Sequence, residues 1–178
     1  MTNGSRTTPD AALKILVIEE DPVRSAILEA GLREAGFLNV TLLGNATGLL
    51  EQVYRADPEV ILIGLENPSR DVLEQMFSVS RAVKRPIAMF VDQSDSASIA
   101  AAVDAGVSSY IVDGLKKDRI KHILDISISR FNAFSRVSTE LEQTKSALAE
   151  RKVFDRAKGI LMTRKGLSEE QALSLIHI

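Results

Sequence analysis

Five short apolar runs, each followed by a stretch with helical spacing, constrain the fold of this chain more than any other feature. The first run, Leu13–Ile18, is apolar apart from Lys14 and ends in the continuous stretch ILVI, which is typical of a strand buried on both faces. Asp21 and Pro22 then provide an N-cap and a proline at the first helical position, for a helix that reaches Ala35. Further strands are predicted at residues 40–43, 60–64, 87–91 and 109–112, with helices at residues 49–54, 71–81 and 96–105. This alternation predicts an α/β fold in which helices cover both faces of a doubly wound, five-stranded parallel sheet.

A single long helix is predicted to follow the sheet, because no proline or glycine interrupts the chain from Lys116 until Gly159. Its apolar residues recur at spacings of three and four, which indicates an imperfect heptad and a parallel coiled-coil homodimer. The dimerisation residues are Phe134, Val137, Leu141 and Leu148, with Ile123 near the start and weaker positions at Ser127, Arg130 and Thr144. The alternative is a helix that packs in cis on its own sheet domain.

The stretch Arg151–Ala172 is predicted to contain the end of this helix, a stop and a second helix. Gly166 stands where a helix ends on a left-handed residue, and Ser168 with Gln171 forms a capping box for the next helix. One side of the first helix is an apolar stripe of Val153, Phe154, Ala157, Ile160 and Leu161, surrounded by lysine and arginine. A basic helix pair indicates an acidic partner such as nucleic acid, and the alternative is a packed hairpin with a solvated basic face.

The charge of the chain is divided unevenly along its length. The formal net charge is only −2 over 178 residues, a length that suits one domain with an appendage. Residues 1–118 hold 11 Lys and Arg against 17 Asp and Glu, which gives −6. Residues 119–178 hold 11 against 7, which gives +4. The basic part therefore suits contact with nucleic acid, and the acidic part does not.

The chain lacks the sequence features that several classes of protein require. The chain has no cysteine, no glycine-rich loop after the first strand and no apolar run of 18 residues. We therefore expect no disulfide, no metal, no cofactor, no membrane span and no enzymatic activity. Residues 1–12 are polar and lack the apolar core of a secretory signal, so we expect a disordered tail and a cytoplasmic protein. His122 and His177 are expected at the surface.

The run AKGILM at residues 157–162 carries a family resemblance, together with Arg151 and Val153 before it and LSEEQA after it. It resembles the ANTAR module of antitermination regulators of the AmiR/NasT family. The resemblance implies a small three-helix unit that binds paired RNA stem-loops and favours an antiterminator over a terminator hairpin. The candidate RNA-binding residues are Arg151, Arg156, Lys158, Gly159 and Arg164. Lys158 is the strongest candidate. Gly159 is expected at a close helix crossing, and the alternative is that the missing side chain lets an RNA backbone approach the helix. Residues 174–178 do not continue the family pattern, so we expect a truncated module.

The first part of the chain resembles a response-regulator receiver domain in the runs KILVIEEDP, PEVILIGLENP, RPIAMF and AGVSSYIVDGL. The resemblance implies a flavodoxin-like fold whose chemistry needs a phosphoacceptor Asp, an acid pair for Mg²⁺, a Thr or Ser and a Lys. The acid pair is kept as Glu19 and Glu20. The other three positions are occupied by Gly64, Val91 and Asp113. We therefore predict a pseudo-receiver with a vestigial acidic pocket and no phosphoacceptor.

These observations predict four segments: a tail at residues 1–12, a receiver-like domain at 13–118, a dimerising helix at 119–150 and a partial ANTAR module at 151–178. The family domain is expected to begin near residue 136. The predicted function is an RNA-binding antitermination regulator controlled by a ligand-sensing partner protein. The runs FVDQSD and YIVDGL are most similar to NasT-like nitrate regulators. The alternatives are a phosphorelay regulator with a non-standard acceptor such as Glu66 or Asp71, and a dimeric protein-interaction adaptor.

Overall fold

The computed structural model describes residues 11–44, 48–166 and 168–176. Residues 1–10 of the predicted tail (residues 1–12), and His177 with Ile178 of the unmatched C-terminal run, lie outside the described residues. The strands are β1 (Ile15–Ile18), β2 (Val40–Leu43), β3 (Val60–Leu65), β4 (Ile87–Val91) and β5 (Ser109–Val112). The helices are α1 (Pro22–Glu34), α2 (Leu49–Ala56), α3 (Arg70–Ala82), α4 (Ser96–Asp104), the 3-10 helix η1 (Lys117–Arg119), α5 (Ile120–Lys165) and α6 (Glu169–Ile176). The chain divides into two compact units at Asn132 and Ala133.

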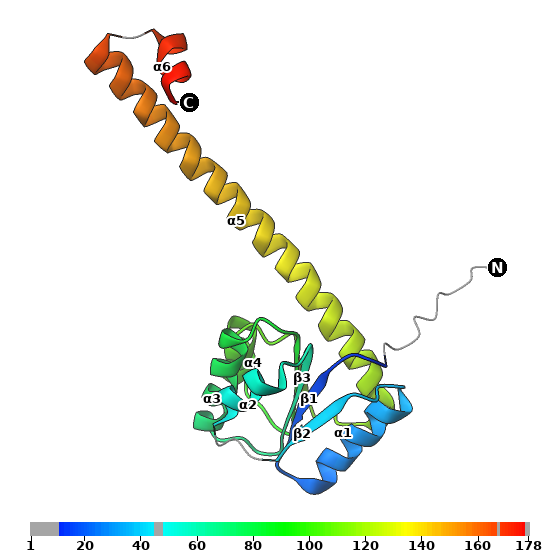
Figure 1. Ribbon diagram of the computed structural model, residues 1–178. Helices are drawn as coiled ribbons and strands as arrows, with labels where there is room; N and C mark the ends of the chain where they lie inside the picture. The colour runs from blue at the N-terminus through cyan, green and yellow to red at the C-terminus, as the bar shows by residue number, and fades with distance from the viewer. Residues whose placement is uncertain (1–10, 45–47, 167, 177–178) are drawn as a thin grey trace, which may run out of the picture. The chain divides into compact units, whose positions relative to one another are not determined.

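The first unit contains the five-stranded parallel sheet that the sequence predicts, and its strand order is β2-β1-β3-β4-β5. Strands β1, β2 and β3 of this sheet are labelled in Figure 1. Strands β1 and β4 are buried along their whole length, because both of their faces are covered. Helices α2, α3 and α4 pack on one face, and α1 packs with the first turns of α5 on the other. All carboxyl ends of the strands meet at one edge, which is where the loops of such a sheet form sites.

The first turns of α5 correct part of the heptad prediction. Ile123 and Leu124 are buried in the core beneath β1 and β3 rather than placed on a seam for a second chain. Ser127 is also buried, with its Oγ 2.8 Å from the Ser109 Oγ and 2.7 Å from the Ile123 carbonyl oxygen. The alternative of packing in cis therefore holds for this part of the helix, and the seam interpretation of Ile123 and Ser127 is wrong.

The second unit contains the rest of α5 followed by α6. The proposed seam residues Phe134, Val137, Leu141 and Leu148 are each more than half exposed in the single chain. Gly166 has φ +63°, which confirms the predicted left-handed helix stop. The predicted capping box also forms, since Ser168 N donates to Gln171 Oε1 at 3.0 Å and Gln171 N donates to Ser168 Oγ at 3.3 Å. Over the described part of the chain, no helix combines the length and apolarity needed to cross a bilayer.

Candidate functional sites: a strand-end pocket and a basic helix pair

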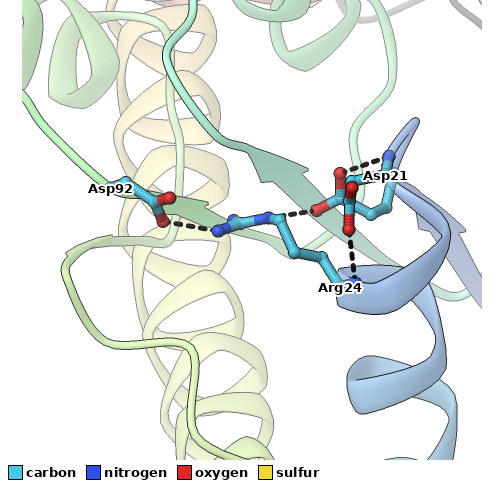
Figure 2. Close-up of polar contacts among 4 residues, drawn as sticks. Asp21, Arg24 and Asp92 are labelled. Carbon is cyan, nitrogen blue, oxygen red and sulfur yellow. Dashed lines mark hydrogen bonds and ion pairs between the residues drawn. The ribbon is translucent and has the colours of Figure 1, made fainter.

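The carboxyl end of β1 leads into a pocket that contains an arginine among its acids. Asp21 caps α1 by accepting a hydrogen bond from Arg24 N at 2.8 Å, with Pro22 at the first helical position. This cap places Arg24 beside the strand ends, where its Nε lies 2.9 Å from Glu19 Oε2. Its Nη1 lies 2.5 Å from Asp92 Oδ1, which follows β4 (Figure 2). The guanidinium therefore joins the end of β1 to the end of β4, and Arg24 and Asp92 are 68 residues apart in the sequence.

The bridge is shielded from water on the Glu19 side. The Glu19 side chain is 2% exposed and that of Arg24 is 12% exposed, whereas Asp92 is 39% exposed. Glu19 Oε1 also accepts a hydrogen bond from Asp21 N at 3.0 Å. Burial lowers the pKa of Arg24, but the hydrogen bonds and charges of Glu19 and Asp92 outweigh burial and raise it. The guanidinium thus stays charged and neutralises acids that the sequence alone suggested were uncompensated.

Gly64 lies in β3, directly in front of this bridge. A Cβ atom added to Gly64 would overlap Glu19 Oε2 and lie 3.0 Å from Glu19 Cδ. The carboxylate of Glu19 therefore occupies the space into which a side chain at residue 64 would extend. The structure brings Gly64 and Glu19 together, and the missing side chain is what makes room for the carboxylate.

The other residues of the predicted acidic pocket have different surroundings. Glu20 is exposed, and Val91 is buried within the sheet at the end of β4. Asp113 is exposed, has φ +49° and donates its backbone N–H to the Val91 carbonyl oxygen at 2.9 Å. Asp113 lines an open cavity of about 500 Å³ together with Arg24, Asp92 and Lys116. Within the described residues, no group of three acids or histidines is placed to hold a metal ion.

Sequence reasoning missed Arg24 and the role of Asp92. The only local signal for Arg24 is its position three residues after the capping Asp21, in the first turn of a helix that begins at a strand end. That signal predicts where the Cα atom of Arg24 lies but not which acids its guanidinium binds. Asp92 directly follows the predicted strand at residues 87–91, and nothing in the sequence connects it with Arg24.

The basic helix pair of the second unit also contains an ion pair. Lys158 Nζ on α5 lies 2.7 Å from Glu169 Oε1 in the first turn of α6. The hydrogen bond and charge of Glu169 raise the pKa of Lys158, and those of Lys158 lower the pKa of Glu169. Lys158 is therefore engaged within the chain, whereas Arg151, Arg156 and Arg164 are exposed.

Gly159 faces open space where its side chain would be, as far as the described residues extend. A Cβ atom added there would meet nothing within 4 Å. The expectation of a close helix crossing at Gly159 is therefore wrong within the single chain, because α6 reaches α5 on the Lys158 side and leaves the glycine open.

Residues 15–125 match the response regulator receiver domain, a match that covers more than half of the chain. This chain belongs to that family. Residues 142–177 of the same response regulator match the ANTAR domain, so it combines a receiver domain with an ANTAR domain. Both family expectations drawn from the sequence runs are confirmed, although a particular closeness to NasT-like regulators stays a prediction.

This response regulator is similar in sequence to two curated relatives and in fold to one solved structure. It is 26% identical over 176 residues to the transcriptional regulatory protein PdtaR of Mycobacterium tuberculosis, covering 98% of this chain and 86% of PdtaR. It is 25% identical over 131 residues to the transcriptional regulatory protein KdpE of Staphylococcus aureus, covering 74% of this chain and 53% of KdpE. The signal receiver domain of a modulated diguanylate cyclase from Desulfovibrio desulfuricans superposes with a TM-score of 0.57 at 15% identity, over 67% of this chain and 96% of that one. The last likeness concerns the fold alone.

Proposed function

We propose that this response regulator is an RNA-binding transcription antitermination regulator whose receiver domain does not use phosphorylation. The proposal that the receiver domain does not use phosphorylation rests on a single observation, the Glu19–Arg24–Asp92 bridge in front of Gly64. Glycine offers no carboxylate to accept a phosphoryl group. A fixed guanidinium beside two acids also leaves them without the free charge that would attract Mg²⁺.

RNA binding is supported by the ANTAR match at residues 142–177 and by the +4 charge of residues 119–178. The full chain is expected to retard an RNA with two adjacent stem-loops in a gel, with an affinity that falls steeply as salt rises. A single-stranded RNA of the same length and base composition is the control. Equal retardation of both RNAs would mean that the protein binds RNA only through non-specific charge attraction.

Each predicted segment has its own role in this proposal. Residues 13–118 form a receiver-like domain, residues 119–150 a connecting helix, and residues 151–178 an RNA-binding module. The exposed seam of Phe134, Val137, Leu141 and Leu148 supports a parallel homodimer through the connecting helix. Replacing Leu141 and Leu148 by Glu is expected to give a monomer in sedimentation, because the charges would face the seam. Replacing the exposed Thr139 and Ser146 by Glu is the matched control, since neither occupies a seam position.

Control by a partner protein is the remaining part of the proposal. If phosphorylation is not used, a ligand-sensing protein that binds the receiver domain is the alternative way to regulate the RNA-binding module. Changing a two-state balance from 1:99 to 99:1 requires about 5.5 kcal/mol of differential binding. A pull-down with the full chain as bait is expected to recover a stable partner that lowers RNA affinity. Failure to recover one, with full RNA affinity retained in cell extract, contradicts this part alone.

A further inference from the structure

The long helix carries a basic face that the Lys158–Glu169 pair does not use. Residues three and four apart lie on the same side of an α-helix. Such steps along α5 connect six exposed residues that we call the Lys152 face: Lys145, Ala149, Lys152, Arg156, Gly159 and Thr163. Three of the six are cations, and the other three are small. The helical rise places Lys152 and Arg156 about 6 Å apart along the axis.

The charges of this face are not neutralised within the described part of the chain. Lys145, Lys152 and Arg156 form no ion pair with residues 11–44, 48–166 or 168–176, in contrast to Lys158, which Glu169 holds at 2.7 Å. Exposed cations without an internal counter-ion are available to an external anion at low cost in desolvation.

Gly159 makes the helix backbone accessible in the middle of this face. Because a Cβ atom at residue 159 would meet nothing within 4 Å, no packing among residues 11–44, 48–166 and 168–176 requires glycine there. Glycine in a helix interior destabilises the helix relative to alanine. The remaining use of a missing side chain is close approach by another molecule. Lys152 and Arg156 precede this opening by seven and three residues, so a molecule that enters it meets both cations.

The charges favour a nucleic acid over a second copy of the helix as that molecule. The heptad steps from Leu148 lead to Arg151, Asp155 and Lys158, so the apolar seam ends before the Gly159 opening. A parallel second helix at this level would also bring like charges together. A sugar-phosphate backbone supplies negative charge and tolerates contact with small residues.

We propose that the Lys152 face contacts the RNA backbone, with Lys145, Lys152 and Arg156 binding phosphates and Gly159 admitting the strand to the helix. The inference rests on the proposed RNA-binding function and changes the residues assigned to it. Lys152 and Lys145 take the place of Lys158, Arg151 and Arg164. Lys158 instead joins α6 to α5 through Glu169.

The first test compares two double variants of the full chain that lose the same charge. The probe is a two-stem-loop RNA that the wild-type protein has enriched from a pool with randomised loops. Lys152→Ala with Arg156→Ala is expected to lower affinity roughly tenfold or more at 0.1 M salt. It is also expected to reduce the magnitude of the log–log salt slope by about 1.4 to 1.8, because two phosphate contacts are lost. Arg151→Ala with Arg164→Ala, which are exposed and off this face, is expected to leave the slope nearly unchanged.

Two outcomes of this test have different meanings. If the wild-type chain enriches no RNA, the proposed function itself fails. If RNA binds and the two double variants lose affinity and slope equally, RNA binding stands and the Lys152 face is wrong.

The second test uses Gly159→Ala and separates contact from folding. The added methyl group fits the chain and favours the helix, so the thermal midpoint is expected to stay the same or rise. RNA affinity is nevertheless expected to fall severalfold, because the methyl group stands where the strand approaches. Unchanged affinity overturns the role of Gly159. If Gly159→Ala instead weakens the dimer in sedimentation, and RNA affinity falls only as far as the loss of dimer explains, the proposal is overturned. The molecule that packs against Gly159 is then the helix of a second copy of the chain.

Discussion

The ion pairs at the two candidate sites, one around Arg24 and one between Lys158 and Glu169, differ in burial, and the difference separates what each of them does. In the receiver domain, Arg24 is 12% exposed and binds two acids, one of which is almost completely buried. In the ANTAR domain, Lys158 binds the single carboxylate of Glu169, whose side chain is 62% exposed. Solvent and salt screen the second pair strongly and the first pair weakly. The first pair therefore fixes the contents of a pocket, and the second only biases how two helices meet.

Arg24→Ala is expected to produce the largest effect and tests whether the buried bridge is essential to the fold. Removing the guanidinium leaves the Glu19 carboxylate buried without its cation, which costs about 3–5 kcal/mol of the free energy of unfolding. Urea unfolding of the receiver domain, compared between wild type and Arg24→Ala, measures this loss in the free energy of unfolding. Adding Glu19→Gln to Arg24→Ala is expected to recover a large part of the loss, since no charge then remains unpaired. A loss below about 1 kcal/mol for Arg24→Ala would place the bridge among exposed pairs.

Glu169→Gln is expected to have a much smaller effect, which sharpens the contrast. At neutral pH, amide exchange of Ala172, whose N–H donates to the Ser168 carbonyl oxygen in α6, is expected to accelerate by less than about fivefold. Glu170→Gln, an exposed neighbour, is the control. An effect as large as that of Arg24→Ala would show that exposure does not weaken the pair.

The same ion pair predicts how the docking of α6 depends on pH. Because Lys158 lowers the pKa of Glu169, the contribution of this carboxylate is present above its ordinary value of 4.5 and is lost as pH falls through the lowered pKa. Because Glu169 raises the pKa of Lys158, the ammonium contributes fully below its ordinary value of 10.5 and is lost as pH rises through the raised pKa. In a His177→Gln variant, which lacks the imidazole that follows α6 in the sequence, chemical shifts of α6 amides are therefore expected to stay constant between about pH 5 and 10. A transition near neutral pH would assign the docking to another group.

The smallest expected effect is the absence of a reaction. Acetyl phosphate with Mg²⁺ is expected to leave the intact mass of the protein unchanged, because Gly64 lacks an acceptor and Arg24 engages the neighbouring acids. A receiver domain with an acceptor aspartate, treated in parallel, controls for the reagent. A phosphoryl group located on Glu66 or Asp71 would instead favour the phosphorelay alternative.

The sheet was predictable from the sequence because its determinants are local. Continuous apolar runs predict strands covered on both faces, and Asp21 with Pro22 and Ser168 with Gln171 predict helix starts that the structure confirms. The same locality explains the errors. Periodicity assigns Ile123 and Ser127 equally well to a second helix and to the chain's own sheet, so only burial decides between these alternatives.

The candidate sites were less predictable because they depend on contacts between distant residues. Arg24 is defined by Asp92, which lies 68 residues later, and no spacing rule connects the two. Lys158 looked available for RNA because the position of Glu169 depends on how the chain turns at Gly166. Gly159 was expected in a crossing because the sequence shows a missing side chain without showing what stands in front of it.

The overlap between Glu19 and any side chain at residue 64 makes a phosphoacceptor at residue 64 difficult to introduce by one substitution. Gly64→Asp alone would place a carboxylate against that of Glu19, which Arg24 already holds in position. Restoring an acceptor would require Glu19 to move and Arg24 to release it, and each of those changes alone leaves a buried charge unpaired. The intermediate sequences are therefore less stable than either end state. A receiver domain with this arrangement is confined to it by epistasis among residues 19, 24 and 64.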